Sequence, residues 1–226
     1  MSVTAILLFG SLARGDEAEG SDTDLLMINT DDETRHISRG RLSMFLYPWP
    51  RLRRDGKSGD LFVCHLVREA KVIFDPKDYL SRLKQVFRLR SSYASEVKQA
   101  TDLGWFLVRF GGTLNPDLQA KRTLWCIRTI LIARSAELRD PVFAPQLLAQ
   151  RTKSEAARGL LRERHNRRDP DALSHSLREF LEEETSSESF YEEADYAAFR
   201  RRFIEMSNRV ALQTLHQEEN KREDYM

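Results

Sequence analysis

Few features of this sequence point to a disulfide framework or a membrane span. The 226 residues include only two cysteines, Cys64 and Cys126, which lie in apolar stretches without paired spacing. Such sparse cysteine usage is typical of a reducing compartment. No run of 18 apolar residues occurs, and no charged and then hydrophobic leader precedes the first apolar stretch. We therefore expect a cytoplasmic protein with no membrane association.

The sequence also lacks an excess of either positive or negative charge. The 36 Lys and Arg residues and 35 Asp and Glu residues give a net charge of +1, so overall charge makes no case for nucleic-acid binding. We find no internal repeat and no glycine-serine linker. Hydrophobic residues make up 41% of the chain, which is enough to bury a core. This length fits one large domain or two small ones.

A glycine-serine turn follows the first apolar run. Residues 4–9 read Thr-Ala-Ile-Leu-Leu-Phe, a run typical of a buried strand, and Gly10 and Ser11 come directly after it. A glycine there lets the backbone approach phosphates closely. The serine and the following N–H groups, at the start of a short helix, offer donors to an anion.

Two aspartates follow at the entrance of a second predicted strand, residues 24–28. Asp22 and Asp24 are spaced i, i+2, so in a strand their side chains project to one face. Carboxylates in this arrangement hold Mg²⁺ ions that bridge to nucleotide phosphates. The stretch therefore predicts a metal and triphosphate site in which Asp22 and Asp24 are the metal ligands and the catalytic residues.

These residues resemble the signature of the minimal nucleotidyltransferases in the DNA polymerase β superfamily. That signature is a Gly-Ser pair, an Ala-Arg-Gly element and a Ser-Asp-x-Asp-Leu strand start. The matching positions are Gly10, Ser11, Ala13, Arg14, Gly15, Ser21, Asp22, Asp24 and Leu25. The resemblance implies an α/β fold with a polymerase β-like mixed sheet, and Mg²⁺, with Mn²⁺ as an alternative. It also implies nucleotide binding through Gly10, Ser11, Arg14 and Ser21, although Arg14 also fits a structural partner of a local carboxylate.

The resemblance further implies transfer of an NMP group from an NTP, with ATP expected, to an acceptor hydroxyl. Three acceptor classes stay open. One is a protein hydroxyl, as in antitoxins that adenylylate a HEPN toxin. The second is a nucleotide or oligonucleotide, as in antiviral signal synthases, and the third is a drug hydroxyl, as in aminoglycoside-modifying enzymes. The acceptor, the base of the NTP and the oligomeric state are not fixed by the sequence.

The chain separates into two unlike parts. Up to residue 76 short apolar runs alternate with short helical segments, with further strands expected at 41–47 and 71–75 and a helix at 60–70. Beyond residue 76 the apolar spacing becomes helical. We therefore expect a nucleotidyltransferase domain at 1–76 and an all-helical domain at 77–226.

Start signals mark helices in the second part. Asn115-Pro116 and Asp169-Pro170 each place a capping residue before a proline. A single long helix is expected at the end of the chain, with an apolar stripe that contains Phe199, Phe203, Met206 and Val210. On the helix that starts after Asn115, Lys121 and Arg128 are candidates to face the triphosphate, and a solvated surface fits them equally well.

The third carboxylate of the superfamily has no clear counterpart. Its expected position, on the strand after the paired aspartates, is Ser43, which is a poor Mg²⁺ ligand and no base at neutral pH. Asp60 is the nearest alternative, but it fits the N-cap of the next helix better. Either two carboxylates with water and phosphates complete the site, or catalysis is weakened. The second case favours a nucleotide-binding module that masks a partner protein.

Three further patterns are less specific. Seven basic residues lie between positions 151 and 168, and they fit either a solvated surface or a rim for a polyanionic acceptor. His65 and Glu69 form an i, i+4 pair that fits a helix-stabilising contact better than a metal site. Arg158 and His165 have the loose spacing of HEPN ribonucleases, which chance readily gives in such an Arg-rich segment.

Overall fold

The computed structural model describes residues 2–18, 20–31, 33–164, 169–186 and 188–223. The chain folds into two compact units. The first unit comprises the chain up to Ser92 together with Ala136–Ala144, and the second comprises Tyr93–Ser135 and the chain from Pro145 onward. Compactness alone does not define a functional domain, so the division into domains 1–76 and 77–226 stays a prediction.

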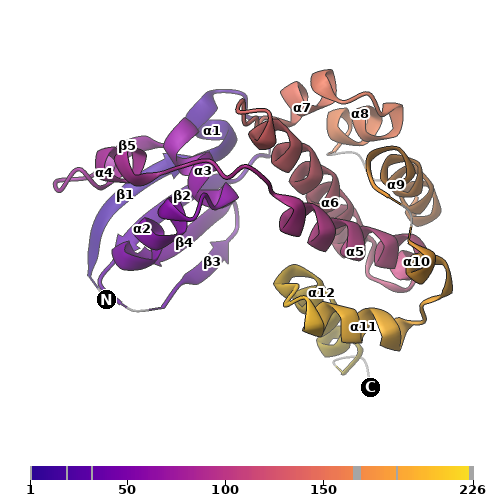
Figure 1. The fold of residues 1–226 in the computed structure, drawn as a ribbon. Coiled ribbons are helices and arrows are strands. Elements are labelled where there is room, and N and C mark those ends of the chain that lie inside the picture. The colour runs from indigo at the N-terminus through magenta and orange to yellow at the C-terminus, as the bar shows by residue number, and fades with distance from the viewer. Residues whose placement is uncertain (1, 19, 32, 165–168, 187, 224–226) are drawn as a thin grey trace. The chain divides into compact units, whose positions relative to one another are not determined.

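The first unit contains a mixed sheet (Figure 1). Within the described residues five strands take the order β3-β4-β2-β1-β5. Strand β1 is antiparallel to β2 and β5, whereas β4 is parallel to β2 and antiparallel to β3. The strand bounds are β1 Val3–Phe9, β2 Thr23–Asn29, β3 Arg35–Arg39, β4 Leu42–Pro48 and β5 Lys71–Phe74.

Four of these strands were expected from apolar runs, and β3 was not. Its sequence is Arg-His-Ile-Ser-Arg, and all five residues are exposed. Strand β3 lies at the edge of the sheet, where burial does not demand an apolar pattern. It is placed by its antiparallel pairing with β4 across the short Gly40-Arg41 turn.

Four helices accompany the sheet in the first unit: α1 Gly10–Arg14, α2 Trp49–Lys57, α3 Leu61–Glu69 and α4 Tyr79–Val86. Helix α3 begins as expected, because the Asp60 side chain accepts a hydrogen bond from the Val63 N–H at 3.0 Å. Helix α2 was not expected from the sequence. It is mostly polar and buries only Leu52 and Gly56, so its apolar signal is weak.

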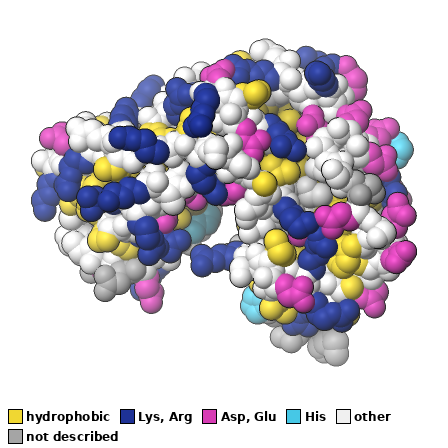
Figure 2. Space-filling model, in the orientation of Figure 1, with side chains coloured by type: hydrophobic (Ala, Val, Ile, Leu, Met, Phe, Trp, Pro, Cys, Tyr) yellow, Lys and Arg dark blue, Asp and Glu magenta, His cyan; other side chains and the backbone are white. Residues whose placement is uncertain are grey.

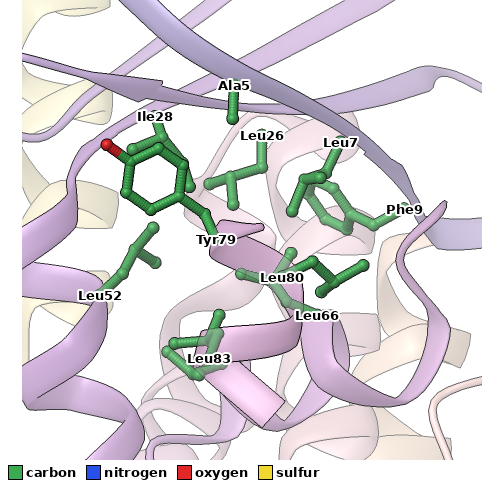
Figure 3. Close-up of a cluster of buried hydrophobic side chains, with 11 residues drawn as sticks. Ala5, Leu7, Phe9, Leu26, Ile28, Leu52, Leu66, Tyr79, Leu80 and Leu83 are labelled. Carbon is green, nitrogen blue, oxygen red and sulfur yellow. The ribbon is translucent and has the colours of Figure 1, made fainter. Parts of the chain in front are cut away.

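The core of this unit lies between one face of the sheet and helices α2, α3 and α4 (Figure 3). Alternate residues of β1 and β2 supply the sheet side, since successive strand side chains point to opposite faces. The helices supply the other side. The buried members are Ala5, Leu7, Phe9, Leu26, Ile28, Leu52, Val63, Leu66, Tyr79, Leu80 and Leu83.

The second unit is helical in its described residues. Both proline-marked helix starts are confirmed. The Asn115 side chain accepts a hydrogen bond from the Asp117 N–H at 3.2 Å, and the Asp169 side chain accepts one from the Asp171 N–H at 3.0 Å. The bounds are α5 Ala94–Phe110, a 3₁₀ turn at Gly111–Thr113, α6 Pro116–Glu137, α7 Pro145–Arg151, α8 Glu155–Arg162, α9 Pro170–Glu184, α10 Ser189–Glu193, α11 Tyr196–Glu205 and α12 Arg209–Glu223.

The expectation of one long terminal helix was wrong, because α11 and α12 are separate helices. Ser207 adopts a left-handed φ of 50° and ends the first. The Asn208 side chain then accepts a hydrogen bond from the Ala211 N–H at 3.2 Å and donates one to the Gln99 carbonyl at 2.8 Å. This capping asparagine restarts the helix in a new direction, although the apolar stripe runs through the break.

The fold class is confirmed as a mixed five-stranded sheet in the N-terminal region followed by a largely helical C-terminal region. Among the described residues, no helix is both long enough and apolar enough to cross a membrane.

The cap at Asp60 gives a test of this local structure. We expect Asp60→Ala to lower the free energy of unfolding by about 1 kcal/mol, because the first turn of α3 loses a side-chain acceptor. Urea denaturation measures the change, with Ser81→Ala on the exposed side of α4 as the control. An unchanged midpoint for Asp60→Ala would show that the cap contributes nothing.

Candidate active site

Phe9, Asp24 and Ser43 lie side by side on three neighbouring strands of the sheet. In the strand register Phe9 is opposite Asp24, and Asp24 is opposite Ser43. Gly10 follows Phe9 directly. Because directly opposed residues share a face of the sheet, Asp24 and Ser43 lie on the face of Phe9, which belongs to the core. This row, Gly10-Asp24-Ser43, forms the centre of the candidate site.

Gly10 is required by its contact with Asp24. Its φ of +76° lies in the left-handed region, and a Cβ added there would stand 2.5 Å from Asp24 Oδ2. Any other residue type would have to displace the Asp24 side chain and would adopt a strained backbone. The backbone between β1 and α1 therefore lies directly against the carboxylate that is expected to bind metal.

Asp22 lies one residue before β2 and is exposed, whereas Asp24 is half-buried. The parallel ladder begins between them, where the Thr23 N–H donates to the Arg41 carbonyl at 2.7 Å. Ser21 holds the preceding turn, since its Oγ accepts a hydrogen bond from the Ala18 N–H at 2.9 Å. The paired aspartates thus stand at the entrance of β2, and the nucleotide-binding role of Ser21 stays a prediction.

Helix α1 is a single turn closed by its own backbone. The Ser11 carbonyl accepts hydrogen bonds from the Gly15 N–H at 2.8 Å and from the Asp16 N–H at 3.2 Å. Gly15 ends the turn with a φ of 82°. These hydrogen bonds fix the backbone of Ser11, the residue for which the sequence predicts contact with the triphosphate.

Arg14 links this turn to helix α3. Its Nε donates to Asp16 Oδ1 at 3.0 Å, and its Nη1 donates to Glu69 Oε2 at 2.5 Å. The structure thus gives Arg14 two carboxylate partners within the first unit. This arrangement matches the structural alternative for Arg14, and its contact with nucleotide stays a prediction.

Glu69 is shared by two partners, because His65 Nε2 lies 2.8 Å from the same Oε2 atom. Burial raises the pKa of Glu69, but the hydrogen bonds and charges of His65 and Arg14 outweigh burial and hold the pKa below its usual range. The His65 ring also stacks on Phe143, with ring centroids 4.5 Å apart. The i, i+4 pair therefore belongs to a packed positioning network around α1.

The position of the third carboxylate is held by serine. Ser43 is 7% exposed and directly opposite Asp24. Its Oγ lies 2.7 Å from Nε2 of His36 on β3. Asp60, the alternative third ligand, caps α3, and burial is the main cause that raises its pKa.

His36 escaped the sequence analysis because β3 was not expected. The available signal was Gly40, which with Arg41 makes a two-residue connection between residues 35–39 and 42–48. Pairing the chain across that turn places Ser38 opposite Ser43 and His36 opposite Phe45. The register of one hairpin would therefore have brought His36 close to Ser43.

The donor set at the site fits a magnesium ion held partly by substrate. Among the described residues, no group of three or more His, Cys, Asp or Glu side chains gathers as a metal site. Mg²⁺ in nucleotide-binding proteins is commonly held by one or two carboxylates, with phosphates and water completing the octahedron. Asp22 and Asp24 are the residues that would supply those carboxylates, and Gly10 leaves room beside Asp24.

Lys121 and Arg128 lie on helix α6 in the second unit, the first exposed and the second half-buried. Their proposed contact with triphosphate stays a prediction. In the basic segment of that unit, Arg158 donates to the Ala149 carbonyl at 3.3 Å and the Thr152 carbonyl at 3.1 Å. It therefore stabilises the connection between α7 and α8. His165, Arg167 and Arg168 lie outside the described residues.

The first part of the chain can be assigned to a family. Residues 1–88 match the family described as the nucleotidyltransferase domain. This segment is a nucleotidyltransferase domain. The match covers all five strands and the helices α1 to α4, so the resemblance seen in the signature residues is confirmed for this region.

Comparison with solved structures adds a distant likeness. A nucleotidyltransferase-like protein from Exiguobacterium sibiricum 255-15 aligns with 16% identity over 80% of this chain and 69% of that chain, with a TM-score of 0.33. No match was found among curated protein sequences.

The contact between Gly10 and Asp24 gives a direct test of the nucleotidyltransferase domain. We expect Gly10→Ala to weaken Mn²⁺ binding and to lower the free energy of unfolding by about 1–3 kcal/mol, because the new Cβ meets Asp24 Oδ2 in a strained backbone. Manganese titration by electron paramagnetic resonance and urea denaturation measure both effects. Gly112→Ala, with no atom within 4 Å of its added Cβ, is the control. Unchanged manganese affinity in Gly10→Ala would show that the close contact between Gly10 and Asp24 is not needed for metal binding.

The Glu69 network predicts a pH dependence of stability. The pKa of Glu69 is lowered from the ordinary 4.5, so its stabilising contribution is present above that value and is lost as the pH falls through the folded-state pKa. We expect Glu69→Gln to be less stable than the parent at pH 7 by about 2 kcal/mol. The difference should shrink below pH 4. Urea denaturation across this pH range measures the difference, with Glu205→Gln, an exposed residue of α11, as the control. A stability difference that does not change with pH would contradict the prediction.

Proposed function

We propose that the nucleotidyltransferase domain transfers an NMP group from Mg²⁺-bound NTP, with ATP as the expected donor, to an acceptor hydroxyl. The observation that carries this proposal is the Gly10-Asp24-Ser43 row, with Asp22 at the entrance of the same strand. The row combines a close backbone approach with a carboxylate and a hydroxyl that lie opposite each other on neighbouring strands. A surface used only for protein contact has no need of either feature.

In this reaction the protein positions the reactants and stabilises charge. Ser11 and the backbone after Gly10 hold the terminal phosphates, while Asp22 and Asp24 hold the metal. The bound metal supplies charge neutralisation at the phosphates. The acceptor oxygen forms a bond to the α-phosphorus as the bond to the β-phosphate oxygen breaks. Pyrophosphate leaves, and the acceptor hydroxyl gives up its proton.

The first unit also carries a basic surface, which begins at the end of β4 remote from Ser43. Figure 2 shows Lys and Arg side chains gathered over the part of this unit that carries α2 and α4. A cavity of about 280 Å³ lies there, lined by Trp49, Arg53, Arg82, Gln85 and Val86. The Arg82 guanidinium stands 4.8 Å from the centre of the Trp49 ring, which fixes one cation at its edge.

Such a surface attracts phosphates or carboxylates and repels a polycation. We propose that the acceptor hydroxyl belongs to a nucleotide, an oligonucleotide or an acidic protein that also contacts this surface, rather than to an aminoglycoside. A toxin-antitoxin or antiviral role agrees with these acceptors. Nucleotide and protein acceptors are separated by offering each to the protein with labelled NTPs.

The proposed function predicts complete dependence on the paired aspartates. We expect Asp22→Asn and Asp24→Asn each to reduce NMP transfer by at least about 100-fold, the scale on which loss of one charge-stabilising group acts. Thermal unfolding should stay close to that of the parent, since neither carboxylate is one of the buried core side chains and asparagine has almost the same shape as aspartate. Mass spectrometry of products from labelled NTPs, Mg²⁺ and a panel of acceptors measures transfer.

Asp117→Asn, an exposed aspartate on α6, is the matched control and should behave as the parent. Normal turnover in either active-site variant would reject the site. If the parent forms no product with any acceptor while still binding NTP, the chain is instead a nucleotide-binding module that masks a partner.

A further inference from the structure

We infer that Ser43 and His36 form a proton relay that replaces the missing third carboxylate, an inference that rests on the proposed transfer reaction. The acceptor hydroxyl passes its proton to Ser43 Oγ as the new oxygen-phosphorus bond forms. Ser43 passes its own proton to His36 Nε2, and His36 then releases a proton to water. Pyrophosphate leaves with the electron pair of the broken bond, so atoms and charges balance.

The first support is the position of Ser43. Strands β2 and β4 are parallel, and their register sets Ser43 directly opposite Asp24. Neighbouring strands lie about 4.8 Å apart, so the hydroxyl stands beside a carboxylate that is proposed to hold the metal. In the proposed reaction the phosphate would be held beside this carboxylate, and the acceptor oxygen would approach it there. Ser43 is therefore the nearest side chain on β4 to receive its proton.

The second support is the hydrogen bond between Ser43 and His36. Ser43 Oγ and His36 Nε2 are 2.7 Å apart, a normal length for a bond that involves a hydroxyl. Serine alone is no base, but an imidazole that accepts its proton turns it into one. The relay requires the tautomer in which Nδ1 carries the hydrogen and Nε2 accepts. Histidine can adopt that form without any change in the fold.

The third support is the packing that holds the imidazole in place. The His36 ring stacks on Phe45, with centroids 4.3 Å apart and an angle of 19° between the planes. Phe45 in turn contacts Phe9 at 5.4 Å and Phe62 at 5.5 Å. Although β3 is an exposed edge strand, the His36 ring packs against a cluster of aromatic rings that extends into the core. Its other side is open to water, which lets the proton leave.

The charged groups around His36 are few. In the described part of the chain β3 pairs only with β4, and the β4 residues opposite it, 42–46, carry no charge. On β3 itself, Arg35 is paired with Glu33 at 3.3 Å, and Arg39 is three residues away. The facing strand therefore carries no carboxylate that would take the proton in place of the imidazole. The carboxylate on the neighbouring strand, Asp24 opposite Ser43, is the one that we propose holds the metal.

The test compares the parent with His36→Gln. We expect kcat for NMP transfer to fall by about 100-fold or more, the usual contribution of a general base, while the KM for NTP and the affinity for Mn²⁺ stay within about twofold. His175→Gln, an exposed histidine on α9, is the matched control.

A rescue experiment separates this relay from a structural role. Ser43→Asp in the His36→Gln background restores a carboxylate at the third position, so it should raise kcat at least about tenfold above that of His36→Gln alone and tighten Mn²⁺ binding. A histidine that merely stabilised β3 would not be replaced by an aspartate on β4. Nuclear magnetic resonance of the His36 nitrogens should show the Nδ1-protonated tautomer, and Ser43→Ala should shift the Nε2 signal.

The outcomes distinguish the relay from the reaction on which it rests. Loss of transfer in Asp24→Asn together with normal kcat in His36→Gln would overturn the relay and leave the proposed function standing. A His36 ring protonated at Nε2 would also overturn it. Absence of transfer in the parent would remove the reaction and the relay together.

Discussion

The candidate site depends on one close contact, the approach of the Gly10 backbone to the Asp24 carboxylate. The antiparallel register of β1 and β2 sets Phe9 opposite Asp24, so the chain must turn directly against that side chain. A left-handed glycine makes the turn without a Cβ that would collide. The turn that we propose to bind phosphate and the strand that we propose to carry the metal ligands are therefore brought together by the pairing of β1 with β2.

Two further sets of contacts hold this arrangement. Arg14 and His65 share Glu69, which ties the turn after Gly10 to helix α3. Below the site Phe9, Phe45 and a ring from α3 form an aromatic cluster that continues into the core. Ionic and aromatic contacts thus fix α1, β2 and β4 from one side of the sheet. The opposite end of the row, at Ser43, is left for His36 on β3.

Local signals predicted much of the fold. The strands β1, β2, β4 and β5 are short apolar runs, and helices α3, α6 and α9 begin at capping residues that the structure confirms. Each of these signals acts within a few residues. Strand β3 and helix α2 lack a strong apolar pattern, and the break at Ser207 and Asn208 lies inside an uninterrupted apolar stripe. There the decisive contacts come from elsewhere in the chain, as with the Gln99 carbonyl that binds Asn208.

The sequence by itself determined which residues make up the proposed site, because Gly10, Ser11, Asp22 and Asp24 lie within one stretch whose strand and turn geometry follows from local pattern. It also showed that the third carboxylate was missing at Ser43. Only the tertiary structure decided what stands there instead. The hydrogen bond between Ser43 and His36 joins the adjacent strands β4 and β3. It exists because the turn at Gly40 sets one hairpin register among several that the polar sequence of β3 would allow.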